Sequence, residues 1–162
     1  MAKSKQSQGT PATVALTKAK VEFSTHMYDH DPAAKSFGME AAEALGLAAE
    51  QVFKTLLVEV DGKLTVGVVP VDKQLDLKAI AAAAGGKKAV MADPAAAERT
   101  TGYVVGGISP IGQKRALPTV VDSTATEHAK VYVSGGRRGL DIGLSPADLI
   151  TVTKARTAAI AR

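Results

Sequence analysis

The chain has 162 residues, 46% of them hydrophobic and 22% charged, which is enough apolar material for one globular domain with its own core. A formal net charge of +4 permits a polyanionic partner, and the absence of cysteine excludes disulfides, thiolate zinc sites and a cysteine nucleophile. No apolar run approaches the roughly 20 residues of a membrane span, and residues 1–9 lack the apolar centre of a secretory signal. We therefore expect a cytoplasmic protein without a membrane partner, with a disordered leader over 1–9 and one domain over 10–162.

The first half of the sequence alternates predicted helices with predicted strands. Thr10-Pro11 places a side-chain oxygen at a helix N-cap and a proline at the first helical position, where its missing N–H costs nothing. Asp61-Gly62 is a strong signal for a two-residue hairpin turn. In chain order, the expected elements are a helix over 11–22, a strand over 23–28, a helix over 36–45 ended by Gly46, two hairpin strands over 52–60 and 63–69, and a helix over 76–84 ended by Gly85.

The second half continues the same mixture in shorter pieces. Asp93-Pro94 and Ser145-Pro146 repeat the combination of a capping side chain and a first-turn proline. The expected elements are a strand over 88–91, a helix over 94–101, strands over 119–122, 130–134 and 141–144, and a helix over 146–150. The predicted fold class is therefore α/β of the mixed α+β kind: a single domain in which helices surround one curved sheet, mixed or antiparallel.

Lys54 interrupts an apolar run and lies on the more apolar face of its predicted strand. Alternate side chains of a strand share a face, so Lys54 points the same way as Val52, Leu56, Val58 and Val60. Full desolvation depresses a lysine pKa by roughly 3–5 units, so a buried lysine normally has a carboxylate, a phosphate or a polar ligand group as its partner. Lys54 is thus the first candidate for a site. The alternative is a lysine whose stem covers apolar surface while its ammonium group reaches water.

Two glycine-rich segments are the next candidates. Residues 102–114 place unshielded backbone N–H groups beside Pro110, an arrangement that suits the binding of oxyanions or carbonyl oxygens. This segment is not a phosphate loop of the nucleotide triphosphate kind, because Gln113 stands where the required lysine should be. Residues 134–141 combine glycines, two arginines, a hydroxyl and a carboxylate. They form either a hairpin tip with solvated arginines or a site where arginine contacts phosphate.

The usual nucleophiles and metal ligands are missing from the sequence. The three histidines have no metal-site spacing, and neither a metal nor another cofactor is expected. Ser109-Pro110 lacks the Gly-x-Ser-x-Gly elbow of serine hydrolases. Any reaction must therefore rely on backbone polarisation, on Lys54 and on groups of the substrate.

Three separated motifs, at residues 52–56, 102–112 and 133–141, closely resemble the YbaK/EbsC family of bacterial aminoacyl-tRNA deacylases in order and approximate spacing. The resemblance extends from about Thr10 to the C-terminus. It implies an editing domain similar to the insertion domain of bacterial prolyl-tRNA synthetases, with a curved sheet or a partly open barrel. The implied activity is trans-editing, in which a lyase or hydrolase of the aminoacyl ester clears mischarged Cys-tRNA(Pro). The implied partners are aminoacylated tRNA, in particular tRNA(Pro), and prolyl-tRNA synthetase.

The resemblance also implies roles for individual residues. Lys54 matches the family's essential lysine, and Gly106 and Gly107 would hold the ester carbonyl through their N–H groups. The residues expected to line the pocket are Tyr28, Phe37, Thr55, Ile108, Ser109, Pro110, Ser134 and Asp141, the last of which would receive the α-ammonium group. Contacts with the tRNA backbone are expected from Lys114, Arg115, Arg137 and Arg138, for which a role as solvated surface charges is the alternative.

The mechanism implied by the resemblance is substrate-assisted: the cysteinyl thiolate attacks its own ester carbonyl and releases a cyclic thiolactone and free tRNA. Two other functions stay open. The protein could deacylate another small aminoacyl-tRNA such as Ala-tRNA(Pro), or it could be a non-catalytic module that binds tRNA or a synthetase. One methylene in a pocket discriminates by only about 1–3 kcal/mol, so a few contacts could switch the preferred amino acid.

Overall fold

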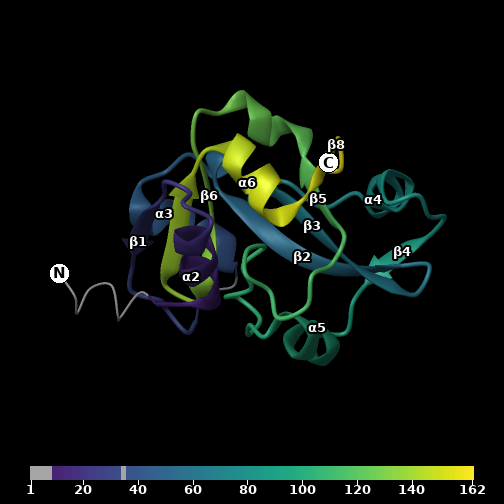
Figure 1. The fold of residues 1–162 in the computed structure, drawn as a ribbon, viewed down its shortest axis with the longest axis horizontal. Helices are drawn as coiled ribbons and strands as arrows, with labels where there is room; N and C mark the ends of the chain where they lie inside the picture. Colours follow the sequence, from purple (N-terminus) through teal and green to yellow (C-terminus); the bar gives the residue numbers. More distant parts are fainter. Residues whose placement is uncertain (1–8, 34–35) are drawn as a thin grey trace.

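Two β-sheets form the frame of the fold (Figure 1). The structure is a computed structural model that describes residues 9–33 and 36–162, so the predicted leader over 1–9 lies outside the described residues except for Gly9. The larger sheet has the strand order β4-β2-β3-β5-β8, and the smaller sheet has the order β1-β7-β6. The strands are β1 (Ser24–Met27), β2 (Phe53–Val60), β3 (Lys63–Pro70), β4 (Ala89–Met91), β5 (Thr119–Asp122), β6 (Val131–Arg137), β7 (Leu140–Leu144) and β8 (Arg156–Ala158).

The prediction of a mixed α/β single domain is confirmed, with one difference in its sheet. Two sheets are present within the described ranges where one curved sheet was expected, and they do not close into a barrel. An isolated parallel bridge between Val52 and Tyr132 links the entry of β2 to β6. The two sheets therefore meet at the beginning of β2, beside the lysine singled out from the sequence.

The β2–β3 hairpin is the centre of the larger sheet. Its strands pair antiparallel over their whole length around the Asp61-Gly62 turn, as predicted. Both turn residues have positive φ, 50° at Asp61 and 85° at Gly62, which is the type I′ geometry that matches the twist of a hairpin. β4 pairs antiparallel with β2, whereas β5 pairs parallel with β3 and β8 parallel with β5, so the larger sheet is mixed.

Within the described ranges, five α-helices surround the sheets, and each begins at a polar cap. They are α2 (Pro11–Lys18), α3 (Phe37–Leu45), α4 (Leu77–Ala83), α5 (Pro94–Thr101) and α6 (Pro146–Thr153), with short 3-10 helices η1 (Ala49–Gln51) and η2 (Ser123–Glu127) that were not predicted. A first-turn backbone N–H donates to each of the capping side chains Thr10, Ser36, Asp76, Asp93 and Ser145. None of these described helices is long and apolar enough to cross a membrane.

The main differences from the prediction are two helix ends, the end of one strand and one missed strand. β6 runs to Arg137 rather than to residue 134. α2 ends at Lys18 rather than at residue 22, because Lys20 adopts a left-handed backbone with a φ of 58°. α6 runs past the predicted residue 150 to Thr153, whose Oγ1 donates to the Leu149 carbonyl at 2.7 Å. β8 was missed, because its three residues are mostly exposed and are ordered by parallel pairing with β5.

Both faces of β2 are covered by apolar residues. Phe53 and Leu57 belong to one core, between the two sheets and the helices α2 and α6. Val58 and Val60 belong to a second core, which packs against α4 through Ile80. Lys54 therefore lies on a strand that packs against an apolar core on each of its two faces.

Candidate functional site

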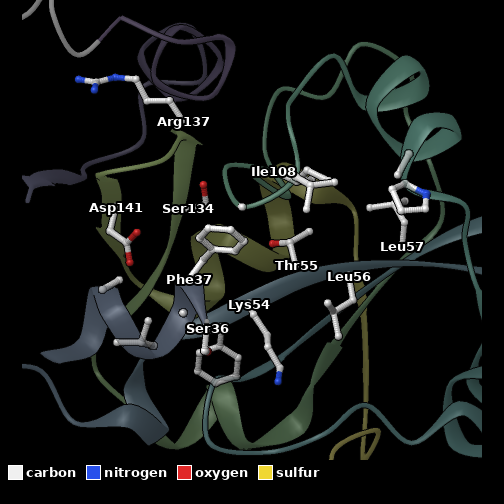
Figure 2. A pocket seen from close by; sticks show the side chains of 18 of the residues that line it. Ser36, Phe37, Lys54, Thr55, Leu56, Leu57, Ile108, Ser134, Arg137 and Asp141 are labelled. Carbon is white, nitrogen blue, oxygen red and sulfur yellow. The ribbon is translucent and has the colours of Figure 1, made fainter. Parts of the chain in front are cut away.

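A cavity of about 350 Å³ lies where the two sheets meet (Figure 2). Its walls come from the first half of β2, the starts of α3 and α5, the loop after α5, and the facing strands β6 and β7. Among the residues singled out from the sequence, those that line it are Tyr28, Phe37, Lys54, Thr55, Gly106, Ile108, Ser134, Arg137 and Asp141. Those that do not line it are Gly107, Ser109, Pro110, Lys114, Arg115 and Arg138.

Lys54 reaches the cavity from β2 and is partly buried. Burial lowers the pKa of its ammonium group, and the carboxylate of Asp72 opposes this effect. Lys54 and its neighbour Thr55 leave the strand on opposite faces, and in Figure 2 the amino group of Lys54 is directed away from Ser134 and Asp141. The ammonium group of Lys54 is therefore placed to meet a different part of a ligand from the part that meets Asp141.

Asp141 is a buried carboxyl group in the cavity wall. It lies on β7 with 5% of its surface exposed, opposite His26 of β1 on one side and Ser134 of β6 on the other. No lysine or arginine among the described residues forms an ion pair with it. Burial raises the pKa of Asp141 to about 7, and burial followed by the charge of Asp141 raises the pKa of Tyr28 to about 12. An uncompensated buried carboxyl group suits a cationic group of a ligand.

Asp141→Asn is expected to change how the stability of the protein depends on pH. The carboxyl group has a pKa of about 7 in the folded protein against an ordinary value of 3.8, so between these values the folded protein holds a proton that the unfolded chain releases. Stability should fall as the pH rises through this window, by a few kcal/mol at most, at about 1.4 kcal/mol per pKa unit. Because asparagine does not ionise, denaturation midpoints at about pH 5 and about pH 8 should lie closer together in the variant than in the wild type. The same difference between the two midpoints in the variant and in the wild type would contradict this prediction.

Two hydroxyl groups also line the cavity, and Figure 2 shows both of them. Thr55 Oγ1 is buried and has no hydrogen-bond partner among the described residues. Ser134 Oγ accepts a hydrogen bond from the Gly136 N–H at 3.2 Å. Buried polar atoms in native proteins nearly always have a partner, so the unpaired hydroxyl of Thr55 indicates a position where a polar group of a ligand would bind.

The glycine-rich loop after α5 carries a tight turn beside the cavity. The Gly107 N–H donates to the Val104 carbonyl at 2.8 Å, and Gly106 has a φ of 89°. A positive φ at only the third of four turn residues is the type II geometry, which favours glycine there. The Gly107 N–H is thus used inside the turn, whereas the Gly106 N–H makes no hydrogen bond among the described residues. Of the two expected backbone donors, Gly106 is the one that remains available to a ligand.

The residues that follow this turn are buried beneath the loop. Ser109 is fully buried, and its Oγ accepts a hydrogen bond from the Ile111 N–H at 3.2 Å. The Tyr103 hydroxyl donates to the Ile111 carbonyl at 2.6 Å. Pro110 is buried as well. Ser109 and Pro110, which were expected to face the ligand, therefore hold the shape of the loop.

The four basic residues expected to contact tRNA have different surroundings. Lys114 and Arg115 are exposed at the end of the glycine-rich loop. Arg137 lines the edge of the cavity, and Figure 2 shows its guanidinium group directed outward. Arg138 is exposed, yet its guanidinium group donates twice to the Val105 carbonyl.

Part of the apolar cavity wall was missed in the sequence. Leu57 of β2 lines the cavity together with Met91, Ala92, Pro94 and Ala97. Met91 is 52% exposed, so it contributes an apolar edge rather than core packing. No local pattern marks these residues, because their position follows from the pairing of β4 with β2.

Known proteins resemble this chain in sequence and in fold. The sequence matches the family described as "Aminoacyl-tRNA editing domain" over residues 31–152. It is 37% identical over 166 residues to the protein named "Putative Cys-tRNA(Pro)/Cys-tRNA(Cys) deacylase EbsC" from Enterococcus faecalis, covering 99% of this chain and 98% of that protein. A crystal structure of a hypothetical protein is 27% identical with a TM-score of 0.84, covering 94% of this chain and 100% of the other. A crystal structure of "a putative trans-editing enzyme for prolyl tRNA synthetase" shares the fold, with a TM-score of 0.79 at 24% identity and coverage of 94% and 95%.

Proposed function

This chain belongs to the aminoacyl-tRNA editing domain family, and we propose that it is a trans-editing deacylase that removes cysteine from mischarged Cys-tRNA(Pro). The observation that carries the proposal is the buried Asp141 carboxyl group, which has no cationic partner among the described residues and lies in a cavity of about 350 Å³. Such a group suits the α-ammonium of an aminoacyl ester. The name of the Enterococcus relative supports cysteine as the amino acid.

Each wall of the cavity has one task in this proposal. Asp141 receives the α-ammonium group, and the Gly106 N–H donates to the ester carbonyl, whose oxygen gains negative charge during the reaction. Lys54, in a different part of the cavity, anchors the terminal adenosine through its phosphate or ribose oxygens. Tyr28 and Phe37 enclose the aminoacyl group or stack on the terminal base, a contact worth about 1–3 kcal/mol.

The substrate supplies the nucleophile in the proposed mechanism. The cysteinyl thiolate attacks the carbonyl carbon of its own ester, which forms a carbon–sulfur bond and places the negative charge on the carbonyl oxygen. Collapse of this intermediate breaks the bond to the ribose oxygen of the terminal adenosine, which takes up the proton that the thiol lost. The products are a cyclic cysteine thiolactone and tRNA with a free ribose hydroxyl. This route needs no nucleophile from the protein, in keeping with a chain that has no cysteine.

Incubating the purified protein with Cys-tRNA(Pro), and in parallel with Ala-tRNA(Pro), tests the proposed function. We expect the cysteinyl ester to disappear faster than it does without protein, and the thiolactone to be recovered as the product. Preferential loss of the alanyl ester would instead make the protein a deacylase for alanine. Binding of tRNA without loss of either ester would make it a non-catalytic module, and either result would contradict the proposal.

Lys114 and Arg115 are proposed to contact tRNA phosphates, because both are exposed basic residues on the loop that borders the cavity. The double variant Lys114→Gln, Arg115→Gln should bind tRNA more weakly and with a weaker dependence on salt. Each lost phosphate contact lowers the slope of log affinity against log salt concentration by about 0.7–0.9. Binding measured over a salt series checks this, and an unchanged slope would make these residues ordinary surface charges.

A further inference from the structure

One arginine side chain joins three segments at the mouth of the cavity. Nε and Nη2 of Arg138 donate to the Val105 carbonyl at 2.9 Å and 2.6 Å. The guanidinium carbon also lies 4.9 Å from the centroid of the Phe37 ring, within the range of a cation–π contact. Arg138, in the turn after β6, is thereby bound to the glycine-rich loop and to the first residue of α3.

The two hydrogen bonds set the orientation of a peptide group. In a trans peptide the C=O and the N–H point in opposite directions, so fixing the Val105 carbonyl also fixes the direction of the Gly106 N–H. Turns of types I and II differ mainly by rotation of this central peptide. With its carbonyl held by two charge-assisted bonds, the Val105–Gly106 peptide is kept in the type II orientation.

Packing around Gly106 restrains the same peptide. A Cβ atom on Gly106 would lie 2.7 Å from Arg138 Nε and 3.0 Å from two carbon atoms of the Phe37 ring. The guanidinium group and the ring are therefore in direct contact with the Gly106 backbone. The loop is thus packed closely against both side chains at this residue.

We propose that Arg138 is a positioning residue that holds the Val105–Gly106 peptide so that the Gly106 N–H faces the cavity. The consequence for catalysis rests on the proposed deacylase function, whereas the restraint on the loop does not. The contact with Phe37 makes the same arginine responsible for the position of one aromatic wall of the cavity.

This role differs from the phosphate contact expected from the sequence. A phosphate contact needs mainly a positive charge, which lysine also supplies. Two parallel hydrogen bonds to one carbonyl combined with stacking on a ring need the planar guanidinium group, which lysine cannot replace. Arg138→Lys therefore separates the two roles, and Arg138→Gln shows the effect of losing the charge as well.

The first experiment is hydrogen exchange of the free protein, read by mass spectrometry on peptides that cover residues 103–108. Loss of the restraint should accelerate exchange in this segment by about tenfold in both Arg138 variants, in line with the loss of a hydrogen bond to a charged group. Arg156→Lys is the matched control. Arg156 is also exposed, and its guanidinium group donates a hydrogen bond of 2.9 Å to the Ala83 carbonyl. Arg156 does not line the cavity. The control variant should leave exchange in residues 103–108 unchanged. Unchanged exchange in the Arg138 variants would overturn the proposal.

The second experiment measures deacylation and tRNA binding by the same proteins. Arg138→Lys should lower kcat by about 10²-fold, the cost of misplacing a reacting group by about an ångström. KM and the salt dependence of tRNA binding should stay as in the wild type. Full activity in Arg138→Lys, or a salt slope reduced by about 0.7–0.9 in Arg138→Gln, would show a charge contact instead and overturn the positioning role. A wild-type protein that deacylates nothing would refute the proposed function, while hydrogen exchange would still decide whether Arg138 restrains the loop.

Discussion

Replacing Lys54 with alanine is expected to abolish deacylation and to leave the protein folded. Lys54 is a partly buried cation in the cavity, and its lowered pKa reflects burial that the carboxylate of Asp72 only partly offsets. Asp72 is exposed, so the substitution leaves no buried charge without a partner. Lys54 anchors the terminal adenosine in the proposed site, and loss of an anchor that positions the ester costs about 10²-fold or more in kcat.

A matched pair of variants isolates this effect. Lys63→Ala removes an exposed lysine from the other strand of the same hairpin, outside the cavity, and should leave turnover unchanged. Circular dichroism and the midpoint of thermal unfolding establish that both variants are folded. Normal turnover by a folded Lys54→Ala protein would remove Lys54 from the proposed site.

Seryl-tRNA(Pro) is expected to be cleaved far more slowly than Cys-tRNA(Pro), even when both are bound. The two esters are nearly the same size, but a thiol with a pKa near 8.5 is ionised to a few per cent at neutral pH, whereas a hydroxyl group is scarcely ionised. Intramolecular attack profits from effective molarities that reach about 10⁵–10⁸ M, so even a small thiolate fraction is sufficient. Single-turnover rates with protein in excess over each tRNA compare the chemical step directly.

A blocked sulfur provides the control for this comparison. Cysteinyl-tRNA(Pro) methylated on sulfur is larger by one methyl group but has lost the nucleophile, and it should be stable in the presence of the protein. Equal rates for the cysteinyl and seryl esters would point to attack by an activated water. The protein would then be a hydrolase that selects its substrate by size.

Local signals in the sequence account for most of the predicted elements. The N-caps at Thr10, Asp93 and Ser145 and the turn at Asp61-Gly62 were recognisable because their geometry depends on adjacent residues. The division into two sheets and the three-residue strand β8 were not predictable in this way. Both depend on pairing between segments that are distant in the chain.

The residues of the candidate site also differ in whether a local signal could predict their positions. Lys54 stood out because strand alternation placed a cation among apolar residues, and it does line the cavity. The burial of Ser109 was not predictable, because the loop that carries it is packed through Ile111 into a core made with distant residues of α2 and β6. The contact between Arg138 and Val105 joins residues 33 positions apart, so no local motif encodes it.

The position of β1 at the edge of the smaller sheet has a consequence for local opening of the protein. β6 and β7 form a hairpin whose side chains belong to the main core, whereas β1 has only four residues, none of them fully buried, and among the described strands it pairs with β7 alone. Segments with few buried contacts open locally at a lower free energy than core strands do. Detachment of β1 would uncover the edge of β7 that carries Asp141, while Lys54 stayed on an ordered strand. The environment of the carboxyl group would then change before the lysine lost its place.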